Sequence, residues 1–193
     1  MARGGIDIKC ILGQSLWHVG LWMTCRIRMA THDDAGLLAA LIREAFRDVA
    51  ERFKLTPENC PTHPSHCTAD WITSALKKGI LYFILEADRE PCGCVALERA
   101  NSDVCYLERL GVLPRCRGKG FGKALVETAL EKAQALGAKN MEIGIISEQK
   151  ELENWYNKLG FSNKGRRPFK HLPFEVTFMT RNFFGDSLSK VNE

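Results

Sequence analysis

The sequence predicts a single mixed α/β domain, and two patterns carry that prediction. Short apolar runs typical of strands alternate with segments in which apolar residues recur at helical spacing. In addition, a turn with three glycines follows one strand-like run directly and opens the longest helical segment. The predicted order is a strand, two helices, three consecutive strands, a helix, a strand, a helix and a last strand.

Length and composition fit one globular domain with short tails. The chain has 193 residues, of which 45% are hydrophobic and 26% are charged, and this balance is far from that of disordered or fibrous chains. A formal net charge of +4 is too small to predict a nucleic-acid partner. We expect the domain at residues 25–182, between an N-terminal extension at residues 1–24 and a C-terminal tail at residues 183–193.

The cysteines and an apolar stretch near the amino terminus both favour a cytoplasmic protein. Eight cysteines would suit a disulfide framework only in a small secreted domain without its own core, so we expect reduced thiols. The mainly apolar stretch at residues 10–23 is only 14 residues long and is interrupted by the polar residues Gln14 and His18. A membrane span needs ~20 apolar residues. No small-x-small cleavage site follows, so we expect neither a membrane segment nor a secretory signal.

The amino-terminal half is predicted to contain one strand and two helices. Residues 25–29 alternate like a strand, and the first helix has its apolar face between residues 38 and 49. Residues 54–67 contain three prolines and are predicted to be irregular. Thr68 then caps a short helix that ends at Gly79.

The remaining half is predicted to be richer in strands. Residues 88–91 are typical of a turn and indicate a hairpin, and the clearest helix of the chain begins at Gly120 and ends at Gly137. The other elements are strands at residues 80–87, 92–100, 104–113, 141–145 and 174–180, and a helix at residues 150–158.

A glycine-rich turn (residues 117–123) links the run at residues 104–113 to the helix that follows. Gly118, Gly120 and Gly122 lie where the strand ends and the helix begins. Because glycine has no Cβ, backbone N–H groups there can approach a ligand closely, and the helix N-terminus adds the positive end of its dipole. The turn is therefore predicted to bind phosphate groups.

The charge around this turn supports the same prediction. Such a basic cluster creates a favourable potential for a phosphorylated ligand, and a purely structural turn would not require it. Between residues 109 and 126 there is no acidic residue, and there are five basic ones: Arg109, Arg115, Arg117, Lys119 and Lys123.

Two common phosphate-binding motifs do not match the turn. A P-loop requires G-x-x-x-x-G-K-[ST], but Lys123 lies at the wrong spacing from Gly118 and is followed by Ala124. A dinucleotide fingerprint requires G-x-G-x-x-G, and its third glycine position falls on another residue in every register. The pattern that matches is R-x-x-G-x-G, from Arg117 to Gly122.

Residues 110–125 resemble the acetyl-CoA motif of the GNAT superfamily of N-acetyltransferases. Residues 154–161, Asn-Trp-Tyr-Asn-Lys-Leu-Gly-Phe, resemble the second motif of that family, at the family's spacing. The resemblance implies a GNAT-like α/β fold, with a mostly antiparallel central sheet of six or seven strands and about four helices. It also implies an enzyme that transfers an acetyl group from acetyl-CoA to a primary amine, with no metal.

The resemblance further implies which residues bind acetyl-CoA. The strand at Leu110, Gly111 and Val112 is expected to pair with the pantetheine arm and to offer a backbone N–H to the thioester oxygen. Gln149 takes the place of an asparagine that often contacts the pantetheine, and its amide can make similar hydrogen bonds. The diphosphate is assigned to Arg117, Gly118, Lys119, Gly120, Phe121, Gly122 and Lys123.

Acetyl transfer also needs groups that move protons. Tyr156 lies where the family commonly places the tyrosine that protonates the coenzyme A thiolate. An alkylamine is mostly protonated at neutral pH, so a carboxylate or a water chain should help to remove a proton. Glu108 is the preferred candidate and Glu142 the second, although either could be a solvated strand residue.

The loop at residues 60–67 combines two cysteines with two histidines. On chemistry alone these could bind zinc, but an adjacent histidine and cysteine rarely reach one ion, so no metal site is predicted. The resemblance places this loop at the acceptor pocket, with His63 and His66 as substrate contacts, and residues 166–174, which include His171, as the opposite wall. A proline-stiffened surface loop is the alternative.

One alternative function and two properties stay open at this point. A non-catalytic acyl-CoA-binding regulatory module would use the same glycine-rich turn but would not need Tyr156. The acceptor amine is either a small molecule or a peptide, and the oligomeric state is not determined, with a homodimer as one option.

Overall fold

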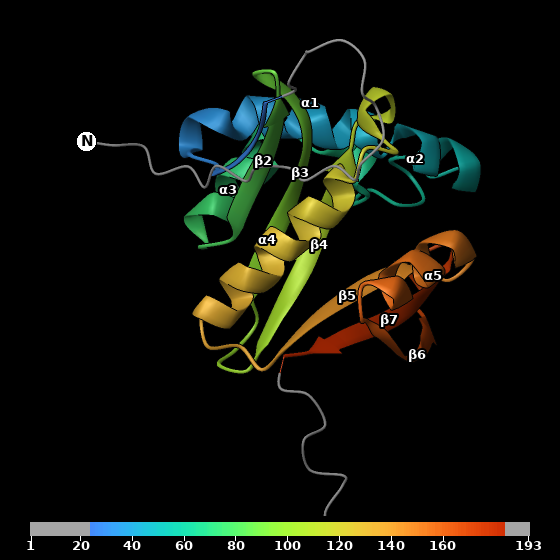
Figure 1. Cartoon of the computed structure of the whole chain (residues 1–193). Helices are drawn as coiled ribbons and strands as arrows, with labels where there is room; N and C mark the ends of the chain where they lie inside the picture. Colours follow the sequence, from blue (N-terminus) through green and yellow to red (C-terminus); the bar gives the residue numbers. More distant parts are fainter. Residues whose placement is uncertain (1–23, 184–193) are drawn as a thin grey trace, which may run out of the picture.

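The computed structural model describes residues 24–183, so the predicted N-terminal extension and C-terminal tail, apart from residues 24 and 183, lie outside the described residues. Its centre is a seven-stranded sheet with the order β1-β2-β3-β4-β5-β7-β6 (Figure 1). The strands are β1 (Cys25–Met29), β2 (Leu81–Ala87), β3 (Glu90–Arg99), β4 (Val104–Val112), β5 (Asn140–Ile146), β6 (Ser162–Pro168) and β7 (Glu175–Asn182).

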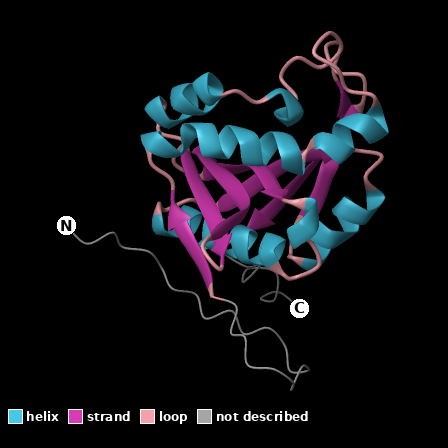
Figure 2. Ribbon diagram, turned by 90° about the horizontal axis from the view of Figure 1, so that it is seen from above, coloured by secondary structure: helices cyan, strands magenta, loops and turns pink. Residues whose placement is uncertain are grey.

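The pairing confirms the predicted mixed and mostly antiparallel sheet. All neighbouring strands pair antiparallel except β4 and β5, which are parallel. Helices lie on both sides of the strands (Figure 2). They are α1 (Ala35–Ala45), α2 (Arg47–Phe53), α3 (Ala69–Lys77), α4 (Phe121–Ala135) and α5 (Lys150–Lys158).

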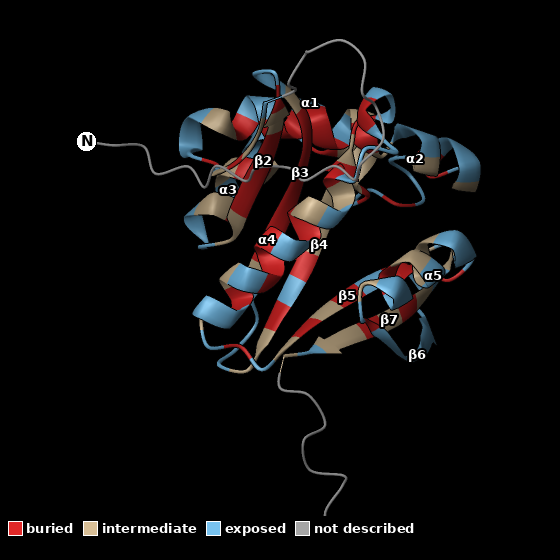
Figure 3. Ribbon diagram, in the orientation of Figure 1, coloured by how far each residue is buried: buried red, intermediate tan, exposed pale blue. Residues whose placement is uncertain are grey.

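Two glycines show how closely α1 and α4 cover β3 and β4. A Cβ at Gly111 would come within 2.9 Å of the Cβ of Ala45, at the end of α1, and a Cβ at Gly93 would come within 3.1 Å of Leu125 in α4. Gly93 pairs with Val112, the neighbour of Gly111, so the two glycines face opposite sides of the sheet. Buried residues concentrate along β2 and β3 and on the inner sides of these helices (Figure 3).

Two elements depart from the predicted order. The helix predicted around residues 38–49 is interrupted at Phe46, whose backbone angles of −105° and 2° separate α1 from the short α2. β6 is exposed at every residue from Ser162 to Pro168, so it lacks the apolar alternation on which strand prediction depends. β6 is instead defined by its backbone pairing with β7.

The strands β4 and β5 separate along their length. They pair only where Val104–Tyr106 meets Asn140–Glu142, and beyond this point they diverge (Figure 1). β5 continues to pair with β7 up to Ile146, and β4 continues to pair with β3 up to Val112. The facing edges of β4 and β5 therefore lack a strand partner in the described chain, and a cleft opens between them.

A β-bulge accompanies this separation. The pairing of β3 with β4 shifts register between Cys94 and Ala96, and Arg109 on the opposite strand has a left-handed φ of 49°. Bulges bend a strand and redirect side chains, and they are common beside active sites. Here the bulge brings the Arg109 guanidinium to the buried Tyr82, whose hydroxyl accepts a hydrogen bond of 2.8 Å.

No described helix combines the length and the apolar character that a membrane crossing requires.

Candidate active site

The cleft between β4 and β5, here called the strand cleft, has a volume of about 880 Å³. Residues from five parts of the chain line it, so it is the point where the fold brings distant segments together. They come from β4 (Leu107, Glu108, Arg109, Leu110, Gly111, Val112), β5 (Ile143, Gly144, Ile145, Ile146), the α1–α2 region with its loop (Ala45, Phe46, Asp48, Val49, Arg52, Thr62, His63, Pro64), the glycine-rich turn (Arg117, Gly122), and the α5 and β7 region (Gln149, Glu151, Leu152, Trp155, Tyr156, Phe174, Val176).

The glycine-rich turn presents a row of free amides at the N-terminus of α4. Gly118 and Gly120 have φ values of 76° and 78°, which a residue with a Cβ rarely adopts. Within the described chain, none of the amides of residues 118–123 donates to a protein acceptor, whereas Ala124 already donates to the carbonyl of Gly120. A Cβ at Gly118 would meet nothing within 4 Å, so the space in front of the turn is open.

This arrangement fits an anionic ligand such as a diphosphate. Unpaired N–H groups at a helix start, together with the helix dipole, favour negative charge. Phe121 can offer such a ligand only its amide, because its side chain is only 2% exposed in the core below α4. Gly122 lies beside Trp155, and a Cβ there would make an ordinary van der Waals contact of 3.5 Å with the indole ring.

The five cations around the turn are not a free basic cluster in the folded protein. Lys119 has no ion-pair or hydrogen-bond partner among residues 24–183. The other four meet carboxylates: Arg109 with Glu108 at 3.5 Å, Arg115 with Glu44 at 3.2 Å, Arg117 with Asp48, and Lys123 with Glu127 at 3.6 Å.

Arg117 ties the turn to the end of α1. Its guanidinium pairs with Asp48, donates to the carbonyl of Ala45 at 2.8 Å and, through Nε, donates to the carbonyl of Val112 at 3.0 Å. Hydrogen bonding to Arg117 lowers the pKa of the Asp48 carboxyl below its usual value. Arg117 was predicted to bind a diphosphate, but in the folded protein its guanidinium already links the junction of α1 and α2 to β4.

Tyr156 lines the strand cleft from α5. Its side chain is 4% exposed and lies edge-on to Trp155 and Phe161, with ring centroids 4.8 Å and 5.3 Å away. Burial raises the pKa of its phenol above the ordinary value. The hydroxyl is protonated at neutral pH, as an ordinary phenol also is, and the raised pKa makes it a weaker acid than an exposed tyrosine.

Glu108 also lines the cleft, from the bulged part of β4. Burial raises the pKa of its carboxyl, while the charge of Arg109 opposes that rise. Glu142, the second candidate, lies where β4 and β5 still pair. It is not among the residues that line the cleft, and its carboxylate pairs with Lys164 at 2.5 Å.

The histidines predicted as substrate contacts are placed in different surroundings. His63 is buried, lines the cleft and packs edge-on against Phe46 at 6.0 Å. Its Nδ1 accepts from the backbone N–H of Ser65, and burial lowers its pKa to about 4. The ring is therefore neutral at physiological pH.

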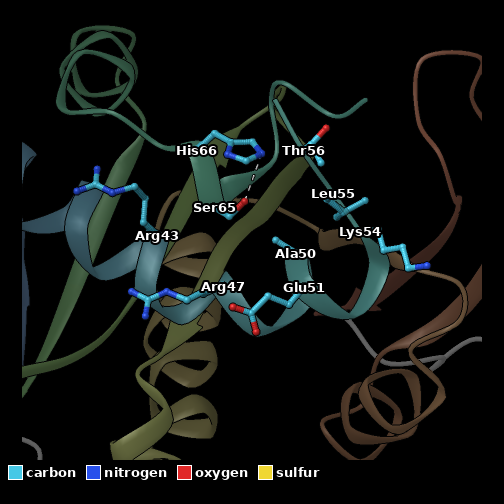
Figure 4. Close-up of a pocket in the computed structure, with 9 residues that line it drawn as sticks. All are labelled: Arg43, Arg47, Ala50, Glu51, Lys54, Leu55, Thr56, Ser65 and His66. Carbon is cyan, nitrogen blue, oxygen red and sulfur yellow. Dashed lines mark hydrogen bonds between the residues drawn. The ribbon is translucent and has the colours of Figure 1, made fainter. Parts of the chain in front are cut away.

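His66 and His171 do not reach the strand cleft. The 3-10 turn at Pro64–His66 directs His66 toward a separate cavity of about 480 Å³ on the outer side of α1 and α2 (Figure 4). His171 is exposed beside Phe169 and lines neither cavity. Of residues 166–174, only Phe174 lines the cleft.

The cysteines of the loop at residues 60–67 lie in apolar surroundings. Cys60 is buried with Leu55 and Ile146 in a small cluster beside α2, and Cys67 is buried in the main core. Within residues 24–183, no group of three or more His, Cys, Asp and Glu side chains is arranged to hold a metal ion.

Several residues of the cleft carry no recognisable sequence signal. Phe46, Val49 and Arg52 approach it because α1 breaks and α2 turns, and Ile143 and Val176 approach it because β5 leaves β4. Apolar residues in helices and strands are normally core residues, so nothing local distinguishes them. Trp155 was the exception, since it lies beside Tyr156 in the second motif.

Comparisons with known proteins identify the family. A model of the acetyltransferase (GNAT) family matches residues 42–161. The uncharacterized N-acetyltransferase YjgM of Escherichia coli strain K12 is 28% identical over 140 residues, which cover 71% of this chain and 81% of that protein. The uncharacterized N-acetyltransferase YvbK of Bacillus subtilis strain 168 is 33% identical over 92 residues, 48% of this chain and 59% of that protein.

Solved structures share the fold at low sequence identity. The PaiA N-acetyltransferase of Thermoplasma acidophilum, in complex with coenzyme A, superposes with a TM-score of 0.69 at 17% identity, covering 83% of this chain and 100% of that one. A GNAT-family acetyltransferase of Staphylococcus aureus Mu50 superposes with a TM-score of 0.65 at 18% identity, with the same coverage of 83% and 100%. Because the family model spans more than half of the chain, the protein belongs to the acetyltransferase (GNAT) family and is an acyltransferase.

Proposed function

We propose that the protein transfers an acetyl group from acetyl-CoA to a primary amine by direct attack of the amine on the thioester. One observation carries this proposal: Arg117 and Gly122 of the glycine-rich turn, the unpaired edge of β4, Tyr156 and Glu108 all line the same strand cleft. A single extended ligand with an anionic end and an amide-bearing arm fits that path.

The chain offers matching partners for each part of acetyl-CoA. The amides of residues 118–123 and the Lys119 ammonium would hold the diphosphate. The free edge of β4 at Leu110, Gly111 and Val112, with Gln149 on the opposite side of the cleft, would hydrogen-bond the pantetheine arm. Acetyl-CoA itself supplies the activated thioester.

Two side chains are placed for the proton transfers. Tyr156, whose phenol is protonated at neutral pH and lines the cleft, would give its proton to the leaving thiolate. Glu108 would accept a proton from the incoming amine, and its raised pKa makes it a better base than an ordinary exposed carboxylate. A backbone N–H on the free edge of β4 would stabilise the oxygen that becomes negative during attack.

The acceptor is proposed to bind at the acceptor end of the cleft (Phe46, Val49, His63, Phe174 and Val176). This end is largely apolar, and its one imidazole is neutral. An amine of a small molecule or of a peptide is the acceptor class. We infer a cytoplasmic location, which the free thiols of Cys60, Cys67, Cys92, Cys94, Cys105 and Cys116 support.

The direct test is release of thiol from acetyl-CoA in the presence of a panel of primary amines. Tyr156→Phe should lower kcat about 100-fold while leaving the affinity for coenzyme A within about twofold, because the lost proton is needed only in the chemical step. Tyr106→Phe is the matched control, since Tyr106 is 39% exposed and lies outside the cleft. Binding of coenzyme A without thiol release from any amine would favour the regulatory module instead.

The base is tested by the pH dependence of kcat/KM. Glu108 must be ionised to accept a proton, so the rate should rise with pH through its raised pKa and then level off. Glu108→Gln should lower the rate about 100-fold and remove this acidic limb. Glu142→Gln should keep the rise of kcat/KM at acidic pH. If Glu108→Gln also kept that rise unchanged, Glu108 would be excluded as the base.

A further inference from the structure

Two buried thiols meet beside the glycine-rich turn. Cys92 lies in β3, and Cys116 ends the 3-10 turn at Pro114–Cys116 that leads into the glycine-rich turn. Their Sγ atoms are 2.8 Å apart, and each residue is 5% exposed.

The backbone around the pair is already held in position. The amide of Leu113 donates to the carbonyl of Cys92 at 2.8 Å, and the amide of Cys116 donates to the carbonyl of Leu113 at 2.8 Å. A disulfide has a sulfur–sulfur length of about 2.05 Å, so the two sulfurs would need to approach by roughly 0.8 Å. We expect rotation of the two side chains to supply that approach.

We propose that Cys92 and Cys116 form a redox modification site, at which a hydroperoxide converts the two thiols into a disulfide that fastens the entry of the glycine-rich turn to β3. Neither residue lines the strand cleft, so the bond would form outside the proposed catalytic groups. The site is independent of the proposed acetyl transfer, because its formation requires neither acetyl-CoA nor an amine.

The reaction balances with hydrogen peroxide as the oxidant. One cysteine attacks the peroxide as its thiolate: an S–O bond forms, the O–O bond breaks, and the hydroxide that leaves takes up the proton of the thiol as water. The second thiol then attacks the sulfenic sulfur, the S–S bond forms, the S–O bond breaks, and the hydroxyl leaves with the second thiol's proton as another water. Two thiols are oxidised and one peroxide is reduced to two waters. Burial limits the site to oxidants as small as hydrogen peroxide.

We expect the disulfide to stabilise the fold and not to inhibit binding of coenzyme A. A disulfide restricts the unfolded chain, and a link between residues 92 and 116 should raise Tm by about 5 to 10 °C. Because the side chains can close the distance, the amides of residues 118–123 should stay in place. The affinity for coenzyme A should therefore change less than about threefold.

The experiment uses the purified full-length chain, reduced and then treated with hydrogen peroxide. Mapping under non-reducing conditions should yield a cross-linked peptide pair containing Cys92 and Cys116, lighter by two hydrogens (about 2 Da) and separated again by a reductant. Alkylation should count two thiols fewer in the oxidised chain than in the reduced chain, and the two protected cysteines should be Cys92 and Cys116. Melting and coenzyme A titrations of the reduced and oxidised forms then measure the consequence.

Variants and the possible results decide the question. Cys92→Ser and Cys116→Ser should each lose the cross-linked peptide, whereas Cys105→Ser, which removes another buried thiol, should keep it. Oxidation of other cysteines without the 92–116 link would overturn the proposal, as would a disulfide that lowers Tm. If the serine variants do not fold, the peptide map of the wild-type chain still gives the answer.

Discussion

The two ends of the strand cleft are built in different ways. The glycine-rich turn is a continuous segment whose proposed binding groups are backbone amides, which lack acceptors because the segment leads into the first turn of α4. The acceptor end is made of side chains from α1, α2, the following loop, β5 and β7. A ligand site made of contiguous backbone leaves a motif in the sequence, whereas a site assembled from distant side chains does not.

The electrostatics of the two ends also differ from what the sequence suggests. The turn lies in an acid-free stretch of sequence, yet Glu44 and Asp48 approach it from α1 and α2 and pair with Arg115 and Arg117. The acceptor end contains His63, whose ring burial keeps neutral. Charge at each end is thus set by which elements pack together, and not by local composition.

The sharpest test of this contrast compares two glycines with the same backbone. Gly118 and Gly137 have φ values of 76° and 82°, and a Cβ at either would meet nothing within 4 Å. Gly118→Val should raise the Kd for coenzyme A at least about 100-fold, because a β-branched residue cannot hold the turn that aims the amides. Gly137→Val, at the far end of α4, should lose comparable stability but keep the affinity. Calorimetric titration with coenzyme A measures both affinities. Equal affinities for the two variants would contradict a binding site built from backbone amides.

At the acceptor end, the buried His63 should make the free energy of unfolding depend on pH. His63 has a pKa of about 4 in the folded protein and an ordinary value of about 6.5 when unfolded. Below pH 6.5 the unfolded chain therefore binds a proton that the folded chain refuses, so His63 should lower the free energy of unfolding by about 2 kcal/mol between pH 7 and pH 5. His63→Asn should remove this part of the slope in urea titrations. His171→Asn, at an exposed position, is the control, and a wild-type slope in His63→Asn would show that the ring is not buried.

Arg117 tests whether the turn uses its nearest guanidinium for structure or for the ligand. Arg117→Gln should lower the free energy of unfolding by about 1 to 2 kcal/mol, because it removes donors to the carbonyls of Ala45 and Val112 together with the Asp48 pair. Asp48→Asn should cost less than about 1 kcal/mol, since that pair is half exposed. The affinity of Arg117→Gln for coenzyme A should fall less than about threefold. A tenfold loss would assign the guanidinium to the diphosphate after all.

The smallest expected effect separates two lysines of the turn. Lys119→Gln should weaken coenzyme A about two- to fivefold, and the loss should shrink as salt is added, because an exposed charge near a helix N-terminus contributes little and is screened. Lys123→Gln should change the affinity less than about twofold, since Lys123 already pairs with Glu127. Equal effects of the two substitutions would indicate that the ion pair opens when the ligand binds.

Most of the architecture could be predicted from the sequence because it follows local rules. The apolar period of α4 and its end at Gly137, the Thr68 cap of α3 and the hairpin of β2 and β3 are confirmed. β6 was missed because an exposed edge strand needs no apolar alternation. The break at Phe46 was missed because the apolar positions continue across it into α2.

The sequence by itself determined the glycine-rich turn, the family motifs and the order of the main elements. These depend on backbone conformation and on spacing along the chain, which the residues encode directly. Only the tertiary structure decided that β4 and β5 stop pairing beyond Tyr106 and Glu142 and that Arg117 forms an ion pair with Asp48. It also decided that His63 lines the strand cleft whereas His66 lines the separate cavity. Each of these depends on contacts between residues far apart in the chain, and such contacts exist only once the helices have packed on the sheet.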